Sequence, residues 1–189
     1  MAPTEAAFAR KMTEKALEIG MTRTSFRNAS GLPNRGQKST ARDMAILGAA
    51  LIHDFPKYYS YMSLQSFNYK GKNYKNHNNL LGKYAGADGI KTGYIRASGF
   101  NLVASAERGR ERIIATVFGG RSTATRNARV AELLDMGFKR APSRVALRKP
   151  SKPAYGGSRR AAAKTIRVVR AVKKSPRPRA RTSVSNDAP

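Results

Sequence analysis

The sequence contains no cysteine and no tryptophan, and its only histidines are His53 and His77. Without cysteine the chain forms neither a disulfide nor a zinc–thiolate site, and two histidines are too few for a histidine metal cluster. No apolar run approaches the roughly 20 residues that a membrane-spanning helix needs. We therefore predict no metal site and no cofactor. Both histidines are interpreted as surface or turn residues, without an acid or serine partner at a recognisable spacing.

Acidic residues are scarce, since 11 Asp and Glu face 37 Lys and Arg, for a net charge of +26. The last 49 residues, 141–189, carry half of this charge, contain a single acid and are rich in proline. Such a composition buries too little apolar surface to offset chain entropy, so we predict a disordered basic tail after a single domain over residues 1–140. The alternative for residues 161–174 is a short basic amphipathic helix on an anionic surface.

The run from Asp88 to Tyr94 reads Asp-Gly-Ile-Lys-Thr-Gly-Tyr and contains Lys91, Thr92 and Gly93 in sequence. Lys-Thr-Gly on a strand is one of three motifs of the penicillin-binding serine enzymes. A cation and a hydroxyl at a sheet edge suit a ligand that lies along the strand and ends in a carboxylate. The glycine leaves room for a close approach of the ligand backbone. Alone, three residues are equally compatible with an exposed turn.

The flanking sequence resembles the D-alanyl-D-alanine carboxypeptidases of peptidase family S11, the low-molecular-mass penicillin-binding proteins. The resemblance extends over nearly all of residues 5–140. The matching stretches, in order, are Gly31-Leu32-Pro33 with Ser39-Thr40-Ala41-Arg42-Asp43-Met44, then Asp88 to Tyr94, Gly99-Phe100-Asn101-Leu102-Val103-Ala104-Ser105-Ala106, and Leu133-Leu134-Asp135-Met136-Gly137-Phe138. It implies part of a β-lactamase-like or transpeptidase-like fold and a serine-type activity on peptidoglycan pentapeptides.

Two motifs of that family have no counterpart in the sequence. No serine or threonine is followed three positions later by lysine, so the S-x-x-K motif that supplies the nucleophile and its lysine is missing. The one S-x-N match, Ser66-Phe67-Asn68, lies at the wrong distance from Lys91 and is interpreted as strand sequence. The first residues also lack a basic and an apolar region typical of a signal peptide. We expect the chain to begin after both motifs, through a misplaced start or a truncated gene, and to hold no catalytic residue.

Hydrophobic spacing and capping residues predict the elements. Thr4 begins a helix that ends at Gly20, and Ser39 or Thr40 begins a second, with Thr40 and Asp43 as a capping box, that ends at Phe55-Pro56. Alternation predicts a strand at Phe67 and Tyr69 with a turn near residue 71, then the Lys91 strand, then a hairpin of residues 100–106 and 112–118 with a loop of four or five residues. A last helix ends at Gly137. The order indicates an α+β fold, an antiparallel sheet with flanking helices.

Arginine pairs with a carboxylate through two parallel hydrogen bonds, which makes it the natural partner of a peptide C-terminus. Extending the resemblance without a gap from Lys91 brings Arg126 to the place where the family has its carboxylate-binding arginine. Arg121 is a weaker candidate for that role. An exposed arginine at a helix start is an equally good interpretation of Arg126, because a helix N-terminus attracts anions by itself.

Two classes of function follow. The first is a serine-type D-Ala-D-Ala carboxypeptidase that removes terminal D-alanine through an acyl-enzyme; this chain carries the substrate-binding residues Lys91, Thr92, Gly93 and Arg126. Its partners are then the peptidoglycan stem peptide and, in the full-length form, β-lactams, and its place is the periplasm or the outer face of the inner membrane. The second is an inactive basic module that binds an acidic polymer, namely nucleic acid, lipopolysaccharide or an anionic cell-wall polymer. The basic tail is a candidate contact with such a polymer or with an anionic membrane surface. No specific nucleic-acid motif is visible, and the aromatics are not interleaved with basic residues.

The missing S-x-x-K motif gives a direct prediction about acylation. Purified residues 1–189 are expected neither to release D-alanine from a D-Ala-D-Ala peptide nor to form a stable adduct with labelled penicillin, because serine acyl transfer needs an activated hydroxyl. Mass spectrometry of the penicillin-treated chain measures the adduct. A covalent adduct at a defined serine would contradict the prediction.

Overall fold

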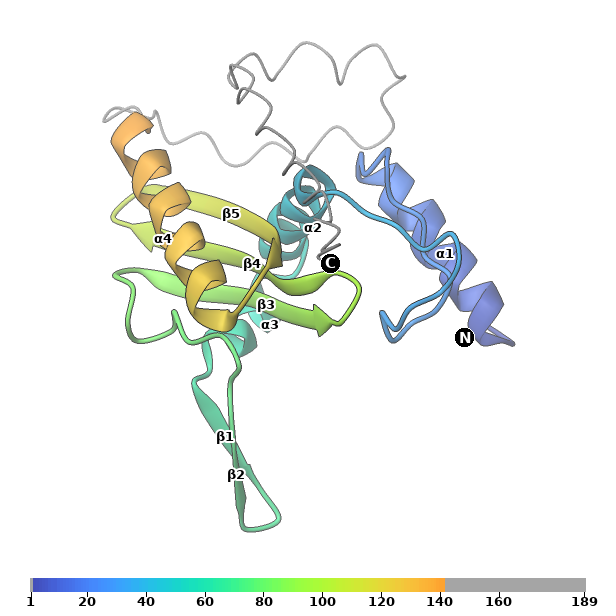
Figure 1. Ribbon diagram of the computed structural model, residues 1–189, viewed down its shortest axis with the longest axis horizontal. Helices are drawn as coiled ribbons and strands as arrows, with labels where there is room; N and C mark the ends of the chain where they lie inside the picture. The colour runs from blue at the N-terminus through green and yellow to red at the C-terminus, as the bar shows by residue number, and fades with distance from the viewer. Residues whose placement is uncertain (1, 142–189) are drawn as a thin grey trace, which may run out of the picture. The chain divides into compact units, whose positions relative to one another are not determined.

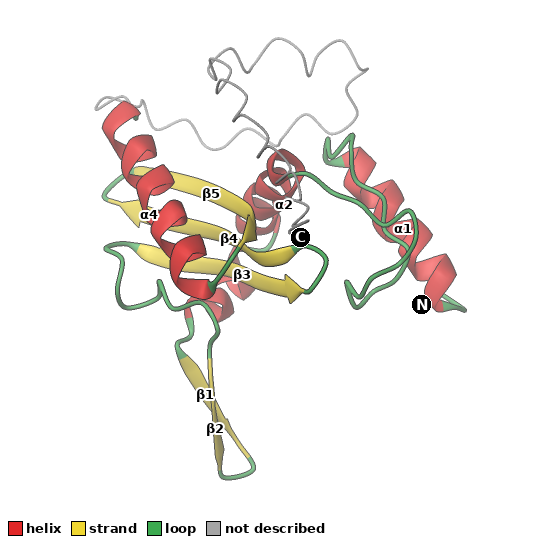
Figure 2. Cartoon of the chain, viewed as in Figure 1, coloured by secondary structure: helices red, strands yellow, loops and turns green. Residues whose placement is uncertain are grey.

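The computed structural model describes residues 2–141, so the predicted tail lies, apart from Ala141, outside the described residues. The elements are drawn in Figure 1 and coloured by type in Figure 2. In chain order they are α1 (Glu5–Glu18), α2 (Ala41–Asp54), α3 (Pro56–Tyr59), the 3-10 helix η1 (Ser60–Ser63), β1 (Ser66–Tyr69), β2 (Lys72–Lys75), β3 (Ala87–Ile95), β4 (Gly99–Arg108), β5 (Glu111–Gly120) and α4 (Thr123–Arg140).

Threonine side chains cap the first two long helices, as the sequence predicts for Thr4 and Thr40. The predicted capping box at Thr40 is only half right. The Thr40 hydroxyl accepts from the Asp43 amide, but the Asp43 carboxylate accepts instead from the Arg23 amide at 2.8 Å and the Thr24 hydroxyl at 2.7 Å. The buried Asp43 carboxylate thus accepts hydrogen bonds from the loop that follows α1, and not from the N-cap of its own helix.

Ala16 of α1 and Ile19, which directly follows the helix, pack with Ala50 of α2 and with the buried Met21 from the loop between the helices. Small residues on both helices allow this close approach. Within the loop that joins the two helices, a short antiparallel backbone bridge pairs Ser25 with Lys38.

Strands β3, β4 and β5 form an antiparallel sheet in that order, and helices cover both of its faces (Figures 1 and 2). Alternate residues of β4 divide between the two layers, because successive side chains of a strand point to opposite faces. Leu102 and Ala104 pack with Val130 and Leu134 of α4. Val103 packs on the other face with residues of α2 and α3. The predicted α+β class with an antiparallel sheet and flanking helices is confirmed.

The turn between β4 and β5 is shorter than predicted. Arg108 pairs with Glu111, which leaves only Gly109 and Arg110 between the strands instead of a loop of four or five residues. The charged residues Glu107, Arg108, Glu111 and Arg112 still pair through their backbones. Both strands therefore extend beyond the apolar residues from which the sequence predicts their ends. Gly109 has φ of 62° and supplies the left-handed conformation that a two-residue turn requires.

The hairpin of β1 and β2 confirms the predicted strand at Phe67 and Tyr69 and the turn at Gly71. Ser66-Phe67-Asn68 lies in β1, as its interpretation as strand sequence requires. All eight strand residues are exposed, and the hairpin extends away from the three-stranded sheet (Figure 1).

Gly137 does not end the last helix, which continues to Arg140. A methyl group at residue 137 would lie 2.5 Å from Cγ2 of Ile113 on β5. The glycine is therefore present for close packing of α4 on the sheet, and the sequence prediction of a helix stop at this point is wrong.

Gly137→Ala is expected to lower the free energy of unfolding even though alanine favours helix by about 1 kcal/mol over glycine. Overpacking of a close contact costs about 1–3 kcal/mol and outweighs that gain. The double variant Gly137→Ala with Ile113→Ala removes the clashing side chain, so the alanine at residue 137 should become neutral or stabilising in that background. Urea unfolding of the four proteins measures the coupling, and an alanine that stabilises both backgrounds equally would refute the packing explanation.

Candidate substrate-binding site

The Lys-Thr-Gly segment lies in the middle of β3, an edge strand of the sheet. Lys91 pairs with Val103, Thr92 with Leu102 and Gly93 with Asn101. Within residues 2–141, β3 has a strand neighbour on one side only. The other edge presents backbone donors and acceptors to which an extended peptide can add as a further strand.

Asn101 connects this strand to Arg126. An irregularity in the pairing of β4 with β5 lies between Phe100 and Leu102, at Asn101 itself. The Asn101 carbonyl accepts from Nη1 of Arg126 at 3.3 Å, and its side-chain oxygen accepts from the Gly119 amide at 3.0 Å. The residue opposite Gly93 in the sheet thus also holds the guanidinium.

Arg126 stands in the first turns of α4, whose N-cap Ser122 forms a reciprocal capping box with Thr125. Gly120 lets β5 approach closely, since a Cβ there would lie 2.8 Å from Cβ of Arg126. The arginine is only 3% exposed, so its interpretation as an exposed helix-start residue is wrong. Its Nε and Nη2 donate to Oδ1 of Asn127 at 3.1 and 2.8 Å.

The charge of Arg126 has no acidic partner within the described part of the chain. Burial lowers the pKa of its guanidinium below the ordinary value, but an arginine remains protonated in proteins. Buried charges are ordinarily paired. An unpaired buried guanidinium therefore favours an anionic ligand.

Arg126 opens onto a pocket of about 590 Å³ together with Thr92 and Gly93. A Cβ built at residue 93 meets no atom, so the space beside the glycine is open. The remaining residues that line the pocket are Lys75, Asn76, His77, Asn79, Tyr94, Phe100 and Thr123. Three of the four residues predicted to bind substrate thus lie around one cavity. Their role as ligands remains a prediction.

Lys91 does not line this pocket. Its Nζ donates to the Thr92 carbonyl at 2.9 Å, and its side chain lines a neighbouring pocket of about 660 Å³ that also contains Asn101 and Phe118. Adjacent side chains of a strand point to opposite faces, which separates Lys91 from Thr92. The weaker candidate Arg121 is exposed and lines neither pocket.

Sequence reasoning missed the segment of residues 75–79 as part of the site. His77 is exposed, as predicted, but it lines the same pocket as Arg126. The polar run Asn76-His77-Asn78-Asn79, which precedes β3 in the sequence, was the signal that could have indicated this part of the site. His53 is only half-buried and its Nδ1 lies 2.7 Å from Oδ1 of Asp54, so the prediction that it lacks an acid partner is wrong.

Polar contacts fix the start of β3. Asp88 forms an ion pair with Arg112, whose Nη1 also donates to the Ser105 hydroxyl at 2.8 Å, and Arg112 pairs in addition with Glu107. The Tyr59 hydroxyl donates to Asp88 at 3.0 Å. Burial and the neighbouring Asp88 charge raise the pKa of that hydroxyl to about 12. These contacts hold the strand on which Thr92 and Gly93 are displayed.

The buried Asn78 also holds the backbone at the start of the motif, at Gly89. The buried Asn78 amide donates to the Gly89 carbonyl at 3.0 Å. A Cβ at residue 89 would lie 2.5 Å from the Tyr59 hydroxyl, which explains the glycine at this position.

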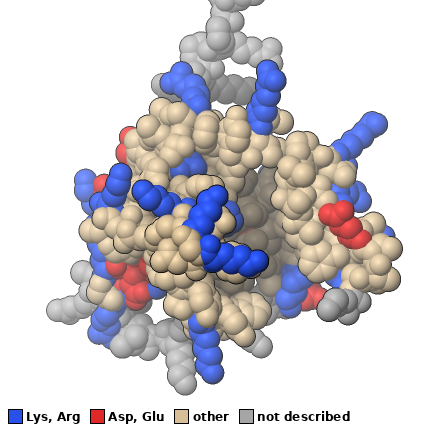
Figure 3. Space-filling model, turned by 90° about the horizontal axis from the view of Figure 1, so that it is seen from below, with Lys and Arg blue, Asp and Glu red and all other residues tan. Residues whose placement is uncertain are grey.

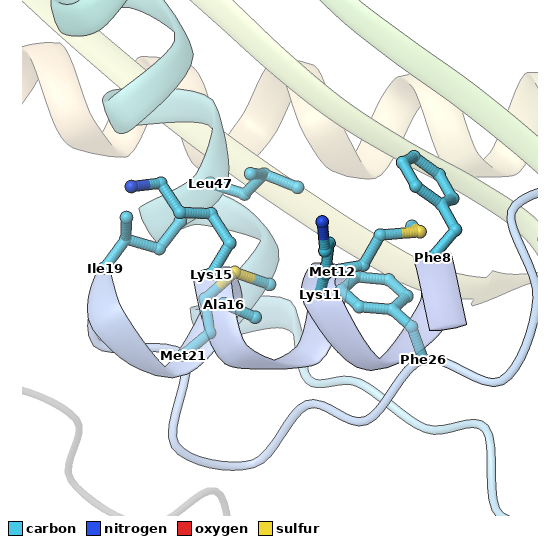
Figure 4. A pocket seen from close by; sticks show the side chains of 9 residues that line it. All are labelled: Phe8, Lys11, Met12, Lys15, Ala16, Ile19, Met21, Phe26 and Leu47. Carbon is cyan, nitrogen blue, oxygen red and sulfur yellow. The ribbon is translucent and has the colours of Figure 1, made fainter. Parts of the chain in front are cut away.

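A separate apolar pocket of about 340 Å³ lies between α1, the following loop and α2 (Figure 4). It has neither a carboxylate nor a hydroxyl nucleophile among its lining residues, which are Phe8, Lys11, Met12, Lys15, Ala16, Ile19, Met21, Phe26 and Leu47. Its lining offers apolar packing rather than catalysis.

Over residues 2–141 no helix is long and apolar enough to span a bilayer, and no cluster of three or more potential metal ligands occurs.

A three-stranded antiparallel sheet between helices, with Lys-Thr-Gly on its edge strand and a buried arginine beside it, is part of a transpeptidase-like fold. The family model for D-alanyl-D-alanine carboxypeptidase, peptidase family S11, matches residues 1–122. The chain belongs to this family.

Relatives and solved structures agree with this membership. The chain is 41% identical over 139 residues to D-alanyl-D-alanine carboxypeptidase DacA of Escherichia coli, a match that covers 73% of this chain and 34% of that protein. Penicillin-binding protein 5 of Haemophilus influenzae superposes with a TM-score of 0.68 at 36% identity, over 71% of this chain and 40% of that one. Penicillin-binding protein D2 of Listeria monocytogenes, solved with ampicillin, gives 0.66 at 33% identity, over 70% and 56%. The chain thus spans about a third of its curated relatives, and its fold is a fragment of the transpeptidase-like fold.

The raised pKa of Tyr59 predicts a loss of stability in alkali. The folded state holds the hydroxyl proton more tightly than the unfolded state, so the contribution is complete below pH 10 and is lost as the pH rises from about 10 toward about 12. Tyr59→Phe removes this titration and should flatten the decline. Tyr84, whose pKa is also raised to about 12, leaves a residual slope. Urea midpoints at several pH values between 8 and 11 measure both proteins, and parallel declines would contradict the assignment to Tyr59.

Proposed function

We propose that this chain forms the substrate-carboxylate part of a serine-type D-Ala-D-Ala carboxypeptidase that removes terminal D-alanine from peptidoglycan pentapeptides. The observation that carries the proposal is the buried Arg126, which has no acidic partner in residues 2–141 and opens beside Thr92 and Gly93. Family membership supports the reaction class.

The free edge of β3 receives the peptide in an extended conformation, through backbone hydrogen bonds. The open space beside Gly93 lets the peptide backbone come close to the strand. The terminal carboxylate then enters the pocket, where the Thr92 hydroxyl and the Arg126 guanidinium donate to it. Asn101 keeps Arg126 oriented toward this end of the strand.

Lys91 has a different task in this arrangement. It lies on the opposite side of β3 from the Thr92 pocket, so it supplies positive charge around the reacting carbonyl rather than a contact within that pocket. The acylation step requires a serine hydroxyl with a proton acceptor, and no S-x-x-K motif occurs in the sequence. This chain's own residues therefore bind and orient the peptide.

The same pocket suits the carboxylate of a β-lactam, and ampicillin is bound in the related Listeria protein. A peptidoglycan substrate also implies that the longer family protein works in the periplasm or at the outer face of the inner membrane.

Arg126→Ala is expected to weaken binding of a D-Ala-D-Ala peptide with a free C-terminal carboxylate about 10- to 100-fold, since charge-assisted hydrogen bonds contribute roughly 1.5–3 kcal/mol. The C-terminal amide of the same peptide should bind weakly to both proteins and lose little more. Arg126→Lys keeps the charge but loses the planar guanidinium, so its affinity for the peptide acid should lie between those of the unaltered chain and Arg126→Ala. Isothermal titration calorimetry measures all combinations.

Arg121→Ala is the matched control, because it removes one exposed arginine near the same helix start and lines no part of the pocket. It should bind both peptides like the unaltered chain. If Arg126→Ala weakens the acid and the amide by the same factor, Arg126 serves the fold and the carboxylate role is wrong.

A further inference from the structure

The β1–β2 hairpin has one aromatic face and one polar face. Residues opposite each other in an antiparallel pair share a face. Phe67 therefore shares a face with its partner Tyr74, and Tyr69 shares it with its partner Lys72. The other face carries only polar residues, Ser66, Asn68, Asn73 and Lys75. This division is typical of a strand pair with one buried face, yet no element within residues 2–141 covers the aromatic side.

The aromatic side chains are largely open to solvent. Phe67 is 56% exposed, Tyr69 57% and Tyr74 40%. The rings of Phe67 and Tyr74 stack with centroids 5.3 Å apart and an interplanar angle of 18°. The stacking holds the two rings in a fixed arrangement while a large part of each side chain remains exposed.

Lysine ammonium groups lie directly over these rings. Nζ of Lys70 is 5.4 Å from the centroid of the Tyr69 ring, and Nζ of Lys72 is 5.3 Å from that of Tyr74. Cations and rings are thus interleaved on the hairpin, which corrects the sequence interpretation that they are not.

Every charged residue in the segment that contains the hairpin, residues 55–87, is basic. No Asp or Glu occurs between Asp54 and Asp88, a stretch that contains five lysines and six of the eight tyrosines. Figure 3 looks onto the face from which the hairpin projects and shows basic side chains gathered in its middle. Charge complementarity therefore requires an anionic partner, and the exposed rings require one with apolar ring faces.

The hairpin also rises from the rim of the candidate substrate pocket. Its second strand ends at Lys75, and residues 75–77 line the pocket together with Thr92 and Arg126. A polymer whose peptide end occupies that pocket is therefore within reach of the hairpin. This continuity distinguishes a polymeric substrate from an unrelated polyanion.

We propose that the aromatic and lysine-bearing face of the β1–β2 hairpin is a second binding surface for an anionic glycan, a polymer of pyranose rings that carries carboxylates. The proposal rests on the proposed function, since it identifies the polymer that bears the peptide. The C–H faces of the sugars stack on Phe67, Tyr69 and Tyr74, whose ring faces are electron-rich. Lys70 and Lys72 pair with the carboxylates. Two contacts on one polymer raise the effective concentration of the peptide at the pocket.

The test measures sedimentation of residues 1–189 with purified peptidoglycan sacculi at fixed salt. Replacing Phe67 and Tyr74 together by leucine keeps apolar bulk but removes the ring faces, and Lys70→Gln with Lys72→Gln keeps the rings but removes charge. Each pair should weaken binding roughly tenfold, which corresponds to 1.4 kcal/mol. Arg10→Gln with Lys11→Gln is the charge-matched control on α1 and should change binding little. Retained circular dichroism shows that the variants are folded.

Two further arms identify the partner. Vesicles of phosphatidylglycerol and phosphatidylcholine in equal parts, and a single-stranded oligonucleotide, should bind the leucine variant as they bind the unaltered chain. Sacculus binding unaffected by both hairpin variants would overturn the proposal. An equal loss for sacculi, vesicles and oligonucleotide would overturn it too, because the surface would then be a general polyanion site.

Titration with a short soluble D-Ala-D-Ala peptide separates this proposal from the proposed function. The hairpin variants should bind that peptide normally, because it does not reach the hairpin. An equal loss of affinity for the peptide acid and its amide in Arg126→Ala refutes the carboxylate pocket, whereas normal sacculus binding by the hairpin variants refutes the second surface.

Discussion

The pairing of β3 with β4 brings the candidate site together from distant parts of the sequence. It places Gly93 opposite Asn101, and the irregularity at Asn101 in the next pairing leaves its carbonyl to accept from Arg126. A one-residue slip would reverse the faces of all these side chains. Burial of alternate β4 residues under α4 and under α2 fixes the register, because both faces of the sheet are packed.

The two ends of β3 are built differently. At its start, Asp88 and Gly89 are held by Arg112, Tyr59 and Asn78 in a network that leaves little space. Beyond it, Gly93 faces open space and the strand edge has no partner within residues 2–141. A rigid start and an open continuation suit a strand that receives a ligand, since the backbone is preorganised before binding.

Local signals predicted the elements but not how they meet. Thr4 and Thr40 mark helix starts by hydrogen bonds within one turn, so the sequence reveals them. Gly137 was misinterpreted because the clash that it avoids comes from Ile113, a residue remote in sequence. The Lys-Thr-Gly run identified the strand, but the separation of Lys91 from Thr92 follows from the pockets that form on each side of the sheet. Burial of Arg126 likewise depends on Gly120 and Asn101.

The central claim is that Thr92, Gly93 and Arg126 form one pocket for a peptide carboxylate. A crystal structure of the chain with a D-Ala-D-Ala peptide tests it most directly. We expect the peptide to lie along the free edge of β3, in either direction, with its carboxylate within hydrogen-bond distance of both Thr92 and Arg126. A peptide bound elsewhere, or a carboxylate directed away from Arg126 with the guanidinium still on Asn101 and Asn127, would contradict the account.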